Sequence, residues 1–134
     1  MNIVKVMLTI SVTAFLAGCQ GNGVSLDQSK AATQPFPSNY KQIIAQELRG
    51  QLFDPYSVRD AGITAPKWGV VGPIYGEQHF VCVRFNSKNR LGGYVGMQYY
   101  TYSWTNGVKT ARWNGGVVCP DLTYLPFPEL GNPK

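Results

Sequence analysis

The stretch from Tyr94 to Trp113 reads YVGMQYYTYSWTNGVKTARW and decides the fold class. Its Asn106-Gly107 dipeptide is typical of a two-residue type I′ hairpin turn, whose central residues both need positive φ. The turn separates two alternating runs, residues 94–105 and 108–113, which therefore read as an antiparallel ribbon. The cross-strand pairs predicted from this turn are Trp104 with Lys109, Tyr102 with Ala111 and Tyr100 with Trp113.

One face of the predicted ribbon is rich in aromatic side chains. These residues are Tyr94, Tyr100, Tyr102, Trp104 and Trp113. Such a face forms either a core under a helix or an exposed platform for glycan or protein binding, and we favour the core because each ring buries about 150–250 Å². The opposite face is mixed and carries Thr110 and Arg112.

Three shorter segments upstream and downstream also read as strands, at residues 57–63, 79–85 and 117–119. A helix precedes them, because Tyr40, Ile43, Ile44 and Leu48 repeat at helical spacing between a cap at Ser38 or Asn39 and a stop at Gly50. The sequence therefore predicts an α+β fold, in which one N-terminal helix packs on a small antiparallel sheet of about four strands.

The N-terminus has the three parts of a secretory signal: Lys5, an apolar run over residues 6–15, and small residues before Cys19. Leu16-Ala17-Gly18-Cys19 resembles the lipobox of bacterial lipoproteins. This resemblance implies cleavage before Cys19, diacylglycerol on its thiol, and acylation of the new amine. Gln20 in place of aspartate then favours the outer membrane, facing the periplasm, and the inner membrane or the cell surface are the alternatives. A plain signal peptide or an uncleaved anchor is the alternative.

The domain organisation follows from these features. Residues 1–18 are the predicted signal peptide, and residues 19–37, rich in small and polar side chains, are a flexible tether after the lipidated cysteine. Residues 38–125 form a single α+β domain, and residues 126–134 a Pro-rich tail. The 134 residues less the signal suffice for one small domain.

The chain contains three cysteines. Lipidation of Cys19 leaves Cys82 and Cys119, an even pair that should form a disulfide in an oxidising compartment. Two free buried thiols are the alternative. Neither a metal nor another cofactor is expected, because these two cysteines and the single His79 have no zinc-site spacing.

The mature segment resembles a group of small uncharacterised proteobacterial envelope lipoproteins. The resemblance rests on Asp54-Pro55-Tyr56-Ser57, Val81-Cys82, Asn86-x-Lys88-Asn89 and Gly92-Gly93-Tyr94-x-Gly96. It spans much of the domain but implies no activity. In the structural interpretation, the segment around these motifs is a hairpin whose shape needs its particular glycines and asparagines. In the functional interpretation, the same segment carries a cationic rim that binds an acidic partner. The predicted partner-binding residues are Arg84, Lys88, Arg90, Lys109 and Arg112.

Catalytic chemistry finds little support, so no catalytic residue is predicted. The seven carboxylates are scattered, and no Gly-x-Ser-x-Gly elbow is present. With 12 Lys+Arg against 7 Asp+Glu, the chain is mildly basic and has no long basic run, so a nucleic-acid partner is not expected. The predicted partners are the membrane, through the lipid, and an envelope protein or anionic envelope polymer. The leading function is a non-enzymatic interaction or structural module. The alternatives are an inhibitor of a host or periplasmic hydrolase and a wall-acting hydrolase.

Overall fold

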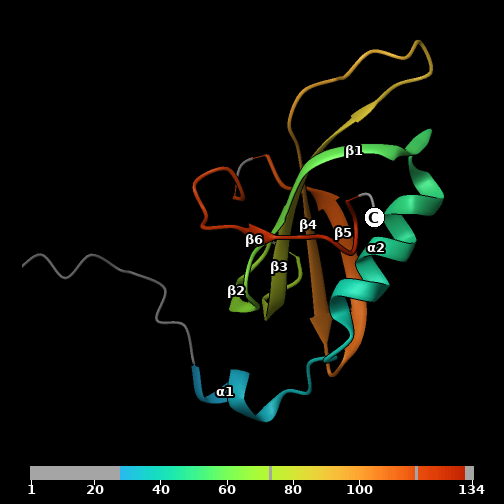
Figure 1. Ribbon diagram of the computed structural model, residues 1–134. Coiled ribbons are helices and arrows are strands. Elements are labelled where there is room, and N and C mark those ends of the chain that lie inside the picture. The colour runs from blue at the N-terminus through green and yellow to red at the C-terminus, as the bar shows by residue number, and fades with distance from the viewer. Residues whose placement is uncertain (1–27, 73, 117, 132–134) are drawn as a thin grey trace, which may run out of the picture.

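The computed structural model describes residues 28–72, 74–116 and 118–131 (Figure 1). This part of the chain forms two helices and a six-stranded antiparallel sheet, so the α+β class is confirmed with more strands than predicted. The elements are α1 (Gln28–Thr33), α2 (Tyr40–Gln51), β1 (Asp54–Ile63), β2 (Lys67–Val70), β3 (Glu77–Lys88), β4 (Gln98–Thr105), β5 (Val108–Asn114) and β6 (Leu125–Pro126). The predicted signal peptide, Cys19 and the tether up to residue 27 lie outside the described residues.

The central strand of the sheet is β3. The strand order is β5-β4-β3-β1-β6, and β2 pairs with β3 beside this path. Two strands pair with the same edge of β3. Strand β2 pairs with its first residues, Glu77 to Phe80, and β1 pairs with its later residues, up to Lys88. The other edge pairs with β4 from His79 to Phe85.

The prediction that the aromatic face of the β4–β5 hairpin is core is confirmed for its β4 residues, whereas Trp113 pairs with Thr101 and not with Tyr100. Tyr102 and Trp104 are 0% and 1% exposed, and they form one cluster with the side chains of β3 and of α2. The alternation of β3 directs Val81, Val83 and Phe85 into this cluster, and α2 contributes Ile44, Ala45 and Leu48 from one helical face. Tyr94 does not join them, because β4 begins only at Gln98 and Tyr94 lies in the connection before it.

The register of the hairpin differs from the prediction beyond its first pair. Trp104 faces Lys109 as expected, but Tyr102 faces Arg112 and Tyr100 faces Asn114. The register shifts between Ser103 and Trp104, and Thr110 is the additional residue. Such a bulge moves every later side chain to the other face, so the predicted pairs with Ala111 and Trp113 and the predicted face of Arg112 were wrong.

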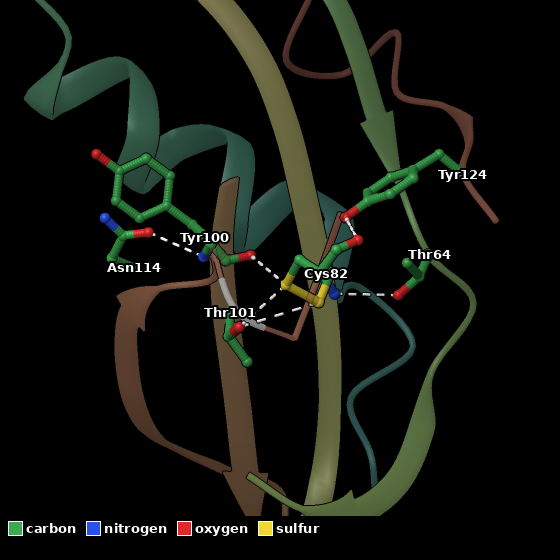
Figure 2. The surroundings of a disulfide bond; sticks show 8 residues. Thr64, Cys82, Tyr100, Thr101, Asn114 and Tyr124 are labelled. Atoms are coloured by element: carbon green, nitrogen blue, oxygen red, sulfur yellow. Dashed lines mark hydrogen bonds between the residues drawn. A yellow bond between two sulfur atoms is a disulfide. The ribbon is translucent and has the colours of Figure 1, made fainter. Parts of the chain in front are cut away.

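A second apolar cluster lies on the opposite face of the sheet and contains the predicted disulfide, which is confirmed. Cys82 on β3 is bonded to Cys119, with an S–S distance of 2.04 Å, and both are fully buried with Val71 and Phe80. Figure 2 shows Thr101 and Thr64 on opposite sides of this bond. The Thr101 hydroxyl lies 3.1 Å from the Cys119 sulfur, and Thr64 accepts a hydrogen bond from the Cys82 amide at 3.0 Å.

The ordered domain begins earlier than the predicted boundary at residue 38. Residues 28–33 form α1, and the following segment packs against the lower end of the sheet in Figure 1. The Gln34 side chain accepts a hydrogen bond from the Asn106 amide at 3.1 Å, and the Phe36 ring lies 5.1 Å from the Trp104 ring. The sequence interpretation of a flexible tether therefore fails from Gln28 onward, because Phe36 supplies an apolar anchor.

Residues 126–131 of the predicted Pro-rich tail are also part of the fold, and residues 132–134 lie outside the described part of the chain. Residues 125–126 form β6, which pairs with Gly62 and Ile63 of β1. Phe127 and Leu130 are each 1% exposed in the cluster under α2. Of the strand expected at 117–119, residue 117 lies outside the described residues, and Val118 lies in a turn. In this turn the Cys119 amide donates to the Gly115 carbonyl at 2.8 Å.

Two tyrosines make the stability of this fold sensitive to alkaline pH. Burial raises the pKa of Tyr102, and burial together with Tyr99 raises the pKa of Tyr124 to about 12. A tyrosine whose pKa is higher in the folded than in the unfolded protein keeps its proton longer when folded, so it stabilises the fold fully below about pH 10. That contribution is lost as the pH rises through the folded-state pKa.

We therefore expect the free energy of unfolding to fall as the pH rises above about 10. For Tyr124 the loss should be on the order of 1 kcal/mol after allowance for its partial exposure to solvent. Urea unfolding between about pH 8 and pH 11 measures it, and Tyr124→Phe should show a shallower dependence on pH. A wild-type midpoint that stays constant over this range would contradict the assignment.

Candidate docking site

The connection between β3 and β4, residues 89–97, is ordered by its own hydrogen bonds. Asn89 holds the turn, because its side-chain oxygen accepts from the amides of Leu91 at 2.9 Å and Gly93 at 3.2 Å. The backbone of Asn89 also donates to Gly93 and accepts from Gly92, which has φ +79°. This glycine is required, since a side chain at positive φ would be strained.

A second asparagine fastens the return half of this connection. The Asn86 side-chain oxygen accepts from the Gly96 amide at 3.1 Å, and the Val95 amide donates to the Ser87 carbonyl at 3.3 Å. Lys88 and Tyr94 form an isolated antiparallel bridge below the turn. The connection thus keeps a defined shape without a hydrophobic core, and it projects beyond the sheet at the top of Figure 1.

Apolar side chains on this ordered connection face solvent. Leu91 is 94% exposed at the turn, and Val95 and Met97 are about half exposed. Phe53, the residue before β1, is 62% exposed and lies under the guanidinium of Arg90 at 5.9 Å. Exposed apolar side chains grouped in one place mark interaction sites more often than single ones do.

Cations contact the aromatic rings of this region. The Arg59 guanidinium lies 3.6 Å from the centre of the Tyr94 ring, and the Lys88 ammonium lies 5.5 Å from it. Residues 86–97 contain no carboxylate. Two acids of β1 lie nearby. Asp54 pairs with Lys88 across the strands, and its carboxylate accepts from the Tyr56 amide at 3.1 Å. Asp60 is paired with Arg59 at 3.7 Å. We call the whole set the loop surface; its residues are Phe53, Arg59, Lys88, Arg90, Leu91, Tyr94, Val95 and Met97.

The structure brings together two of the five predicted partner-binding cations. Lys88 and Arg90 belong to the loop surface. Arg84 lies on the face of β3 that carries the disulfide, with its guanidinium 4.6 Å from the centre of the Tyr124 ring. Lys109 and Arg112 both contact Glu47 of α2, Arg112 at 3.7 Å.

Sequence reasoning missed the other members of the loop surface. Arg59 and Phe53 come from a different part of the chain, and the pairing of Asp54 with Lys88 brings them close. Leu91 could have been recognised, because it is the only large apolar residue between Asn86 and Gly93.

The only histidine of the chain, His79, is occupied by packing contacts. Its ring lies 5.2 Å from the Phe36 ring and 4.9 Å from the Trp68 ring. Its Nε2 atom is 3.2 Å from the Gln34 carbonyl oxygen. Among the described residues, no group of three or more His, Cys, Asp or Glu side chains is arranged to hold a metal ion.

Two open hollows lie elsewhere on the domain, and only the smaller one touches the loop surface, at Met97. The larger, about 520 Å³, lies between α2 and the C-terminal segment and is lined by Gln42, Gln46, Arg49 and Glu129 among others. The smaller, about 260 Å³, lies beside the start of β4. Neither one includes His79.

None of the helices in the described part of the chain is long and apolar enough to cross a membrane. Comparison of the chain with protein-family models, with curated proteins and with solved structures found no match. The case for a function therefore rests on the residues themselves.

Proposed function

We propose that the chain is a lipid-anchored module of the bacterial cell envelope, which acts by binding a partner and not by catalysis. The anchor is Cys19 of the lipobox-like Leu16-Ala17-Gly18-Cys19, and Gln20 favours the outer membrane with the domain in the periplasm. A lipid on Cys19 agrees with the disulfide, which uses the other two cysteines of the chain.

The observation that carries the binding function is Leu91, 94% exposed on an ordered connection. Full burial of a leucine side chain is worth about 1.5–3 kcal/mol, so Leu91 can contribute on that scale when a partner covers it. The hydrogen bonds of Asn86 and Asn89 hold the connection in one shape, which lowers the entropy lost when it binds. Both features suit a docking element.

Metabolic labelling with an alkyne fatty acid tests the anchor. We expect the label on the wild-type protein in the membrane fraction. Cys19→Ala should lose the label, whereas the label should remain on a Cys82→Ala/Cys119→Ala variant. Wild-type protein without label would contradict lipidation.

Chemical cross-linking in living cells tests the binding function. We expect the wild-type protein to give a discrete cross-linked species of higher mass, which Leu91→Asp should reduce at least tenfold, or about 1.4 kcal/mol in binding. Val108→Asp is the matched control, because Val108 is 67% exposed but lies at the β4–β5 turn. Absence of any discrete species from the wild type, or equal loss in both variants, would contradict the proposal.

A further inference from the structure

Helix α1 lies at one end of strand β3, and the loop surface lies at the other end. Strand β3 begins at Glu77, where Lys30 of α1 pairs with the Glu77 carboxylate at 3.6 Å, and it ends at Lys88 in the loop surface. Figure 1 shows α1 and the β3–β4 connection at opposite ends of the sheet. The 12 residues of β3 separate these ends by at most about 36 Å, given a rise of about 3.3 Å per residue.

The length of chain before α1 limits how this domain sits on a membrane. From Cys19 to Gln28 there are nine residues, which span at most about 30 Å when fully extended. This reach is shorter than the separation along β3. If Cys19 is lipidated, as the proposed function requires, α1 lies within about 30 Å of the anchoring bilayer, and a domain that stands upright on it presents the loop surface away from the membrane.

The chemistry of the loop surface distinguishes among the remaining partners. Leu91, Val95 and Met97 are aliphatic, so they gain most from an apolar pocket and little from a polar glycan. A sugar ring would stack on an aromatic face, but the Arg59 guanidinium already lies 3.6 Å from the centre of the Tyr94 ring. The positive charges of Lys88 and Arg90 favour carboxylates in the partner, because oppositely charged rims attract and like charges repel.

We infer that the β3–β4 connection binds a protein of the cell envelope. Its tip inserts into an apolar pocket of that protein, and carboxylates border this pocket. This inference rests on the proposed function and specifies its partner. Leu91 fills the pocket, since hot spots of protein interfaces are side chains buried at the centre of the contact. Lys88 and Arg90 pair with the carboxylates at the border. Phe53 contacts the outer edge of the partner.

Site-specific photo-cross-linking in living cells tests this inference with the full-length chain. A photoreactive benzoylphenylalanine replaces Leu91 in one strain and Val108 in another. We expect a cross-link to one protein from position 91 and none from position 108. Mass spectrometry should place the cross-linked peptide of that protein beside aspartate or glutamate residues.

Charge reversal provides the second half of the test. In the strain with the probe at position 91, K88E with R90E should lower the yield at least tenfold, which corresponds to about 1.4 kcal/mol. The charge-conserving variant K88R with R90K should keep the cross-linking yield of the unsubstituted chain. Retained Cys82–Cys119 disulfide formation in each variant shows that the domain still folds.

Several outcomes would overturn the inference. They are a cross-link from position 91 to lipid or glycan, equal yields from positions 91 and 108, and a protein cross-link that charge reversal leaves unchanged. Fatty-acid labelling of Cys19 in the same cells is read separately. Loss of that label would refute the anchor, whereas a labelled protein with a lipid or glycan cross-link would refute only the protein partner.

Discussion

Replacing both Cys82 and Cys119 with alanine should lower the free energy of unfolding by about 4 kcal/mol, as the chain-entropy account of a disulfide predicts for a loop of this length. The bond joins residues 37 positions apart and encloses the end of β3, all of β4 and all of β5. Both sulfurs are buried on the sheet face opposite α2. Since small domains are stable by only about 5–15 kcal/mol, the loss would remove a large share of the total.

Urea unfolding of the double variant measures this effect. Wild-type protein unfolded in dithiothreitol is the matched control, because it lacks the bond but keeps both sulfur atoms in the core. The two should agree within about 1 kcal/mol, the difference being the cavity left by alanine. A double variant as stable as the oxidised wild type would show that the bond contributes nothing to the fold.

The disulfide could be predicted because counting cysteines needs no knowledge of the fold. The packing around the disulfide could not be predicted from the sequence. Gly115 has room only for hydrogen, since a Cβ there would lie 2.5 Å from the Cys119 sulfur and 3.0 Å from the Thr101 hydroxyl. Nothing in the sequence near Gly115 distinguishes it from Gly116, because the constraint comes from β4.

The helix and the hairpin were predictable for a similar reason, because their signals are local. The apolar spacing of α2 and the Asn106-Gly107 turn can both be read within a few residues. The bulge at Thr110 depends on tertiary contacts instead. It turns Arg112 toward α2, where its guanidinium reaches Glu47 at 3.7 Å and the Tyr100 ring at 4.8 Å. A turn motif fixes the register beside the turn and not five residues away.

The residues of the candidate site also fall into those that local sequence indicates and those that depend on strand pairing. Lys88 and Arg90 were found because they lie in one distinctive segment. Grouping them with Lys109 and Arg112 assumed that all cations on neighbouring strands share a surface, but Glu47 of α2 binds that second pair. Arg59 was missed because only the pairing of β1 with β3 places it near Tyr94.

Phe127→Ala should destabilise the protein by about 3–5 kcal/mol, the usual cost of removing a fully buried phenylalanine ring. Phe127 is 1% exposed among the side chains under α2. Its amide donates to the Ala61 carbonyl at 3.1 Å, which continues the pairing of β6 with β1. The Phe127 carbonyl in turn accepts from the amides of Leu130 and Gly131.

Thermal or urea unfolding measures this effect, and Pro128→Ala is the matched control because the neighbouring Pro128 is exposed. The control should change stability by less than about 1 kcal/mol. If Phe127→Ala behaved like the control, the C-terminal segment would be the loose tail that its proline content suggests. We expect the two variants to differ because Phe127 is part of the core and Pro128 is not. A proline-rich segment can contribute to a core without forming a helix or a long strand. Two large apolar side chains three residues apart, Phe127 and Leu130, are enough to hold it across the sheet.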